Sequence, residues 1–269
     1  MNLSPKSPWI AAVVAGLIVT GCGGTSERRS EQSPARNPSA EQTEAKVQRS
    51  LGTAATVSEQ TGDYSSAIGY YRKLYEKDQS NPEFIIGLSR NLRYGDQGAQ
   101  ARLFMDLVIN QGVDGPPIRA EYGKAQLADG LPDKGVENLA RAIQMGDDGW
   151  PTYSALGTAY DRLENYAEAQ KAYQRAIALS PENPIILNNL ALSLAVSGEL
   201  DRAIEILERA AVRPGTNPTL RQNLAMLHSL NGDKKAARAM GRMDLSEKDV
   251  AKNLEHYQQF LNGNPASRR

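Results

Sequence analysis

Residues 150–183, WPTYSALGTAYDRLENYAEAQKAYQRAIALSPEN, form one unit of an internal repeat, which is the strongest signal in the sequence. Stepping from the first residue of this unit by 34 in either direction finds related segments, and no insertion is needed. The segments begin at Gln48, Pro82, Pro116, Trp150, Pro184 and Pro218. A fixed period of this length indicates an array of short supersecondary units, each of which buries its apolar face against the next.

Small and large residues occupy fixed columns of this alignment. Eight residues into the repeats stand Ala55, Ser89, Gly123, Gly157, Ala191 and Ala225, and twenty residues in stand Ala67, Ala101, Gly135, Ala169, Ala203 and Ala237. Large apolar residues fill the column at twenty-four, namely Tyr71, Met105, Leu139, Tyr173 and Leu207. Glycines between the two small columns, such as Gly130 and Gly198, are suited to end a helix. The small columns therefore predict where the two helices of a hairpin cross closely.

The motif within residues 150–183 is that of a known repeat. Its characteristic residues are Leu156, Gly157, Tyr160, Tyr166, Ala169, Tyr173, Ala176 and Pro181. They resemble the tetratricopeptide repeat, which is a helix-turn-helix unit. We therefore predict an all-α fold, a tetratricopeptide superhelical solenoid of about six repeats over residues 47–245. The repeats from Pro82 and Pro116 match least, because Gly98 and Pro132 replace the usual aromatic residue at the turn. The last repeat also departs, with Gly241 and Asp244 where an apolar and a small residue belong.

A further helix is predicted after the repeats. Ser246 and Asp249 frame a capping box, and Val250, Leu254 and Tyr257 then recur on one helical face. A solenoid needs such a helix to cover its last exposed core. We expect a C-terminal capping helix over residues 246–262 and a short tail over residues 263–269.

The amino-terminal residues are typical of a targeting sequence. Lys6 precedes an apolar run over residues 9–19, which is about half the length needed to span a bilayer. The run ends in VTGC at residues 19–22, which resembles the lipobox of bacterial lipoproteins. The resemblance implies a signal peptide over residues 1–21, cleavage between Gly21 and Cys22, and a diacylglyceryl and an N-acyl lipid on Cys22. An ordinary secretory signal or a short membrane anchor is the alternative.

The residue after the cysteine bears on localisation. Gly23 stands where enteric-type inner-membrane lipoproteins carry aspartate, so the resemblance implies the outer membrane, facing the periplasm. Residues 23–46 contain no large apolar residue. Such a composition predicts that the lipidated N-terminus, residues 22–46, is a flexible tether.

Composition argues against catalysis and against nucleic acid as a partner. The 31 basic and 31 acidic residues balance, so no global field attracts a polyanion. One cysteine and two histidines, His228 and His256, do not suggest a metal site, and no glycine-rich phosphate loop is present. We expect a protein that is not an enzyme and has no small-molecule substrate, no metal and no cofactor besides the lipid on Cys22.

The candidate binding site is the groove of the superhelix. First-helix residues at places two, five, six, nine and twelve of such a repeat usually face this groove. In the last two repeats they include Asn188, Asn189, Gln222 and Asn223. Amides spaced by one repeat can bond the main chain of an extended peptide, or else bond neighbouring turns or water. Arg90 and Arg93 are further candidates that would add positive charge to the same face.

Several segments are more specific than the repeat itself. They are NLALS at 189–193, SGEL at 197–200, RQNLA at 221–225, MDL at 243–245 and the final helix bearing Asn253. Together they resemble the TadD-type lipoproteins of the tight-adherence (Flp pilus) system. The resemblance implies a pilotin-like assembly factor whose protein partner is an outer-membrane secretin subunit or another pilus component. Two alternatives are a pilotin for another type IV pilus or type II secretin, and a periplasmic scaffold that recruits cell-wall hydrolases.

Overall fold

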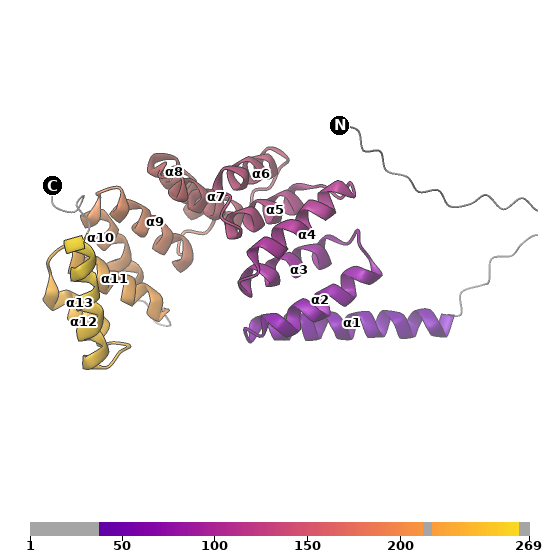
Figure 1. Cartoon of the computed structure of the whole chain (residues 1–269), viewed down its shortest axis with the longest axis horizontal. Coiled ribbons are helices and arrows are strands. Elements are labelled where there is room, and N and C mark those ends of the chain that lie inside the picture. The colour runs from indigo at the N-terminus through magenta and orange to yellow at the C-terminus, as the bar shows by residue number, and fades with distance from the viewer. Residues whose placement is uncertain (1–37, 212–216, 264–269) are drawn as a thin grey trace, which may run out of the picture. The chain divides into compact units, whose positions relative to one another are not determined.

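The computed structural model describes residues 38–211 and 217–263, and across them all regular structure is helical (Figure 1). The helices are α1 Pro38–Gln60, α2 Tyr64–Lys77, α3 Pro82–Tyr94, α4 Gly98–Asn110, α5 Pro116–Ala128, α6 Pro132–Gln144, α7 Trp150–Arg162, α8 Tyr166–Leu179, α9 Pro184–Val196, α10 Leu200–Ala211, α11 Pro218–Leu230, α12 Lys234–Gly241 and α13 Glu247–Gly263. The predicted all-α tetratricopeptide superhelix is confirmed. Within the described ranges, no helix is long and apolar enough to cross a membrane.

Part of the sequence analysis concerns residues that the structure does not describe. The signal peptide, Gly21, Cys22 and residues 22–37 of the predicted tether lie outside the described residues, as do residues 264–269 of the tail. The chain divides into two units, Met1–Thr43 and Glu44–Arg269. The packing between helices described below lies within the second unit.

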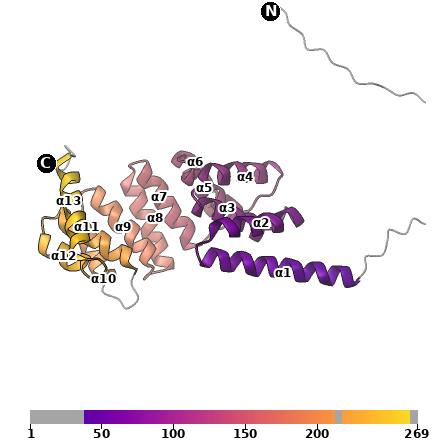
Figure 2. The same cartoon turned by 60° about the horizontal axis from the view of Figure 1, so that its bottom comes forward.

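The predicted register is confirmed at the start of every repeat after the first. The first helices α3, α5, α7, α9 and α11 begin at residues 82, 116, 150, 184 and 218, which are steps of 34. The second helices α2, α4, α6, α8, α10 and α12 begin at residues 64, 98, 132, 166, 200 and 234, again in steps of 34. Each helix from α2 to α13 packs against its neighbours in sequence within that range, as Figure 2 also shows from a second direction.

The small columns mark close helix crossings, as predicted. Ala169 and Ala203 have no exposed surface. A Cβ on Gly123 would lie 2.7 Å from Leu139 Cγ, and a Cβ on Gly157 would lie 2.6 Å from the ring of Tyr173. The small residue at place eight therefore makes room for the large residue at place twenty-four of the same hairpin.

Asparagine and proline define where several first helices begin. The side chains of Asn81, Asn183 and Asn217 each accept a hydrogen bond from the backbone N–H two residues later, at 3.0, 3.0 and 2.9 Å. Proline follows each asparagine at the first helical position, where its missing N–H is not needed. The cap and the proline together fix the start of the repeat.

Helix α1 begins earlier than predicted. Residues 38–46 belong to it, so the prediction that this part of residues 22–46 is a flexible tether is wrong. The segment is rich in Ala, Glu and Gln, which have high helix propensity. Thr43 Oγ1 donates to the carbonyl of Ser39 at 2.8 Å, and Lys77 of α2 pairs with Glu44 at 2.9 Å. Lack of apolar residues predicts exposure here but does not exclude a helix.

The buried residues form two large clusters and a small one between them. One cluster runs from Ala55 to Ala125 and the other from Ala169 to Leu227. Leu127, Leu139 and Ala159 make up the small cluster. The core is therefore thinnest where the third repeat meets the fourth.

The C-terminal helix closes the array as predicted. Gly241 ends α12 early, and a Cβ there would approach Val250 of α13 to 3.0 Å, so the glycine permits close packing. Ala237, Val250 and Leu254 form a buried cluster. The N–H of Asp249 donates to Ser246 Oγ at 3.3 Å, which is the capping bond expected from the sequence. The irregular end of the sixth repeat thus serves the docking of α13.

Candidate peptide-binding face

First-helix residues at places two, five, six, nine and twelve form one face, which we call the first-helix face. Contacts between successive repeats support this grouping. Glu59 at place twelve pairs with Arg90 at place nine of the next repeat. Arg93 at place twelve pairs in the same way with Glu121 at place six of the following repeat. Neighbouring first helices therefore meet along this face.

The structure brings three of the four predicted amide residues together. Asn223 Nδ2 donates to Asn188 Oδ1 at 2.6 Å, and Asn188 Nδ2 lies 3.5 Å from Asn189 Oδ1. All three side chains are half-buried. The sequence left open whether these amides bind a peptide or bond a neighbouring repeat. Asn223 does bond the neighbouring repeat, through Asn188. The Oδ1 of Asn223 and the Nδ2 of Asn189 form no hydrogen bond within the described chain and can still bind a peptide group.

Gln222 lies apart from this chain of amides. Its Nε2 is buried and has no hydrogen-bond partner in the described residues. The side chain is close to Asp244, whose pKa is lowered mainly by the hydrogen bond that Arg221 donates to it, with a smaller contribution from Gln222. Gln222 therefore contributes to packing at the end of the array, and nothing in its surroundings adds it to the asparagine group.

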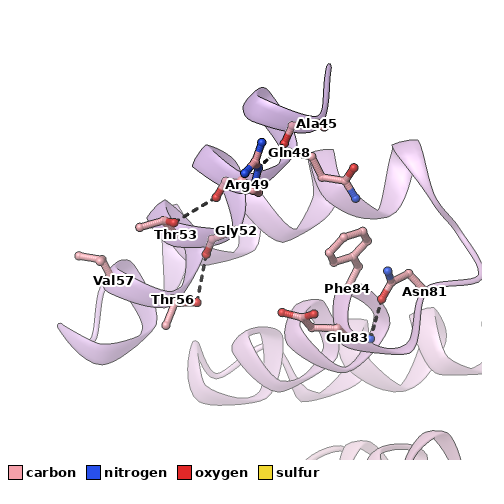
Figure 3. A pocket seen from close by; sticks show the side chains of 10 residues that line it. All are labelled: Ala45, Gln48, Arg49, Gly52, Thr53, Thr56, Val57, Asn81, Glu83 and Phe84. Atoms are coloured by element: carbon pink, nitrogen blue, oxygen red, sulfur yellow. Dashed lines mark hydrogen bonds between the residues drawn. The ribbon is translucent and has the colours of Figure 1, made fainter. Parts of the chain in front are cut away.

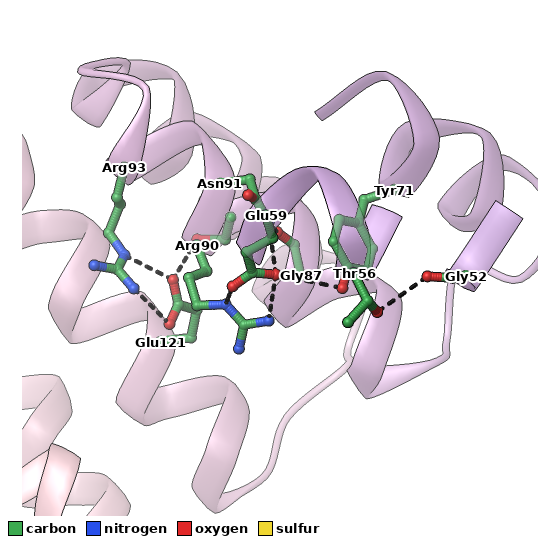
Figure 4. Close-up of polar contacts among 10 residues, drawn as sticks. Gly52, Thr56, Glu59, Tyr71, Gly87, Arg90, Asn91, Arg93 and Glu121 are labelled. Atoms are coloured by element: carbon green, nitrogen blue, oxygen red, sulfur yellow. Dashed lines mark hydrogen bonds and ion pairs between the residues drawn. The ribbon is translucent and has the colours of Figure 1, made fainter. Parts of the chain in front are cut away.

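Arg90 and Arg93 do not provide free positive charge, because both are paired within the protein (Figure 4). Arg93 Nε and Nη2 donate to the two oxygens of Glu121 at 2.8 and 3.1 Å. The Glu121 side chain is only 3 % exposed and also accepts from Ser89 at 3.0 Å. Arg90 Nε lies 2.5 Å from Glu59. The expectation that these arginines add net charge to the face is wrong.

The fourth and fifth repeats are joined through a carboxylate whose hydrogen-bond donors are neutral hydroxyls. Asp161 at place twelve accepts hydrogen bonds from Tyr173 at 2.8 Å and from Ser193 at 2.6 Å. Burial raises the pKa of Asp161, and the two hydroxyls lower it by less. Burial also raises the pKa of Tyr173, whose phenol therefore remains protonated and acts as a donor.

A hollow of about 680 Å³ lies at the other end of the same face (Figure 3). Helix α1 and the start of α3 line it with Ala45, Gln48, Arg49, Gly52, Thr53, Thr56, Val57, Asn81, Glu83 and Phe84. None of the candidate residues named from the sequence lies in this hollow, because they belong to the second, fifth and sixth repeats. Arg49, Gly52, Thr53 and Thr56 are places two, five, six and nine of the first repeat, so the same rule of places would have found it.

The described residues contain no group of histidine, cysteine and carboxylate side chains that could hold a metal ion. His228 is buried, as its register position predicts, and its Nε2 lies 3.5 Å from Glu208. Cys22, the predicted lipidation site, lies outside the described residues.

Comparison with known sequences supports the repeat assignment. Residues 154–218 match the tetratricopeptide repeat model. The chain is similar to the TPR repeat-containing thioredoxin TTL4 of Arabidopsis thaliana, with 43 % identity over 136 residues, 46 % of this chain and 20 % of that protein. It is also similar to bacteriophage adsorption protein A of Escherichia coli, with 23 % identity over 71 % of this chain and 19 % of that protein. The chain thus spans about a fifth of the length of each of these two curated relatives.

Solved structures share the fold at low sequence identity. PilW, a type IV pilus biogenesis factor, aligns with a TM-score of 0.65 and 14 % identity over 78 % of this chain and 97 % of PilW. The pilF protein of Pseudomonas aeruginosa aligns with a TM-score of 0.61 and 16 % identity over 82 % of this chain and 99 % of that one. The repeat match over residues 154–218, the 34-residue register and the shared fold agree that the described chain is an array of tetratricopeptide repeats.

Proposed function

We propose that this protein is a lipid-anchored, pilotin-like assembly factor that binds an extended segment of a pilus secretin on its first-helix face. The observation that carries the binding mode is the half-buried amide chain from Asn223 through Asn188 to Asn189. It ends in one unused acceptor and one unused donor. A peptide unit offers the complementary donor and acceptor, so the chain of amides suits recognition of a partner's main chain.

The membrane and pilus parts of the proposal rest on the sequence. The lipobox ending in Cys22 supports an anchor in the outer membrane, with the repeats in the periplasm. The TadD-type segments, such as RQNLA at 221–225, support the secretin of a tight-adherence (Flp) pilus as partner. The shared fold of PilW is compatible with a role in pilus assembly.

The binding test is a pull-down of detergent-solubilised secretin with the lipoprotein. Changing both Asn189 and Asn223 to alanine removes the free amide groups, and we expect capture to weaken about tenfold, since a net hydrogen bond contributes about 0.5–1.5 kcal/mol. Gln170→Ala is the matched control, because it removes an amide bonded to Ser197 of the next repeat, but from the second helix α8. Circular dichroism of each variant shows whether it is folded.

The same pull-down separates the alternatives. Equal capture by the folded double variant and the native protein would exclude the asparagines from the site. Capture of a type IV pilus or type II secretin instead would reassign the pilotin. Absence of any secretin, together with recovery of a cell-wall hydrolase, would support the scaffold for wall hydrolases.

Anchoring is tested independently of binding. Cys22→Ala removes the thiol that would carry the diacylglyceryl group, so cells making this variant should accumulate a precursor that incorporates no labelled palmitate. Labelling and membrane fractionation equal to those of the native protein would exclude lipidation at Cys22.

A further inference from the structure

Two charged side chains on the first-helix face form no ion pair within the described residues, although both are half-buried. Lys124 is at place nine of the third repeat, and Asp161 is at place twelve of the fourth. The arginine and glutamate residues on this face in the first three repeats neutralise one another in pairs. The middle of the face therefore carries one uncompensated cation and one uncompensated anion.

The two carboxylates that act electrostatically on Lys124, those of Glu121 and Asp147, already have other partners. Glu121 accepts from Arg93 with both oxygens, and Asp147 accepts from the backbone N–H of Gly149 at 2.9 Å and from Thr152 at 3.1 Å. Burial lowers the pKa of Lys124, and this exceeds the opposing effect of Glu121. A half-desolvated ammonium without a direct anionic partner is unfavourable in the free protein.

Asp161 is the opposite case. Its two hydrogen-bond donors, Tyr173 and Ser193, are neutral hydroxyls, and its pKa is set by burial, which raises it, and by these two hydroxyls, which lower it, with no cation among the causes. The carboxylate is held in a fixed position, but its charge is not balanced. Burial has removed part of the solvent around this carboxylate, so an external cation that binds it would supply the charge compensation that it lacks.

We propose that Lys124 and Asp161 form a subsite that fixes the direction of the bound protein segment: Lys124 binds an acidic side chain of the partner, and Asp161 binds a lysine or arginine. The inference rests on the proposed function in taking the ligand to be an extended protein segment. The asparagine amides bind main chain and accept many sequences. Two fixed charges of opposite sign can distinguish the two directions of the bound segment, which the amides cannot, because a reversed segment would place like charges together.

Synthetic peptides test the direction without knowledge of the natural partner. The probes are fluorescein-labelled twelve-residue peptides of Gly, Ser and Ala with one Glu and one Lys, in both orders and at separations of three to six residues. This range covers roughly 10–20 Å of extended chain. Fluorescence anisotropy with the detergent-solubilised full-length protein should show one order binding about fivefold to tenfold more tightly than the other.

Charge-removing variants identify the residues responsible. Lys124→Met and Asp161→Asn keep the approximate shapes and should each abolish most of the preference for one order. The double variant Lys124→Asp with Asp161→Lys should reverse it. Lys134→Met and Asp133→Asn, exposed on α6 in the third repeat, are matched controls and should leave the preference unchanged.

The outcomes distinguish this inference from the proposed function. Equal binding of both orders at every separation, or an unchanged preference in the Lys124 and Asp161 variants, would overturn the subsite even if secretin is captured. A preference that depends on both residues would establish the subsite even if no secretin is captured, in which case the pilus assignment alone fails.

Discussion

The N-terminal half of the repeats, α1 to α6, and the C-terminal half, α7 to α13, share one register but join their first helices by different chemistry. In the N-terminal half, arginine pairs with glutamate between repeats, at Arg90 with Glu59 and at Arg93 with Glu121. These pairs are largely removed from solvent, so each charge depends on its partner.

In the C-terminal half the equivalent links use neutral donors. Ser193 donates a hydroxyl to Asp161, and Asn223 donates an amide to Asn188. The 34-residue register therefore fixes which places meet, while the chemistry at those places is free to vary. Replacing an internal hydrogen bond by a bond to a ligand should therefore cost less free energy in the C-terminal half than breaking an ion pair in the N-terminal half.

The two halves also differ in how closely they follow the repeat pattern. Gly98 begins α4 where the fourth repeat has Tyr166. A Cβ on Gly98 would lie 2.4 Å from the carbonyl oxygen of Ala128 in α5, so the glycine allows α4 and α5 to approach closely. The missing aromatic ring is thus replaced by backbone contact, and the register survives a weak motif.

The largest expected contrast comes from breaking one link in each half. Glu121→Ala leaves the guanidinium of Arg93 largely buried without its carboxylate, and we expect a loss of about 3 kcal/mol in the free energy of unfolding. Asn223→Ala removes one neutral hydrogen bond and should cost about 1 kcal/mol. Urea titrations followed by circular dichroism measure both.

An exposed pair provides the control for this contrast. Glu137 lies 3.5 Å from Lys134 on α6, with both side chains mostly exposed, and Glu137→Ala should change stability by less than about 0.5 kcal/mol. Equal losses for Glu121→Ala and Asn223→Ala would show that the two halves do not differ in the way proposed.

Sequence predicted the register because the register depends on local signals. The small columns, the turn glycines and the prolines at helix starts all act within one hairpin, so the starts of the repeats from α3 onward followed from them. The C-terminal helix began one residue from its predicted start. The conformation of residues 38–46 was missed because the absence of apolar residues was taken as the absence of a helix.

The site was less predictable because it depends on contacts between repeats. Asn188, Asn189 and Asn223 could be placed on one face from their spacing alone. The partners of Arg90 and Arg93 could not, since Glu59 and Glu121 are about 30 residues away and meet them only when successive first helices pack. The sequence shows which charges are on a face, but the superhelix decides which of them remain unpaired.

Overpacking tests whether the two halves share the same crossing geometry. Ala101→Leu in the second repeat and Ala169→Leu in the fourth each place a large side chain at a fully buried crossing. Each should cost on the order of 1–3 kcal/mol, and the two costs should be similar despite the different motifs. Thermal melts provide the measurement. An unchanged melting curve for either variant would show that its helix crossing is not as tight as described.

The smallest expected effect concerns pH, and its sign should differ between two carboxylates. Burial raises the pKa of Asp161, so the folded chain holds this proton more tightly than the unfolded chain, and stability falls as pH rises from about 4 through the folded pKa. As pH rises through this range, Asp161→Asn should therefore gain stability relative to the native protein, by less than about 1 kcal/mol.

The second carboxylate, Asp244, should show the opposite sign. The hydrogen bond from Arg221 lowers the pKa of Asp244, so stability is lost as pH falls through its folded pKa, and Asp244→Asn should be less stable than the native protein near neutral pH. Urea midpoints between pH 3 and pH 8 measure both variants. A difference of the same sign for the two would contradict the view that Asp161 lacks a charge partner while Asp244 has one.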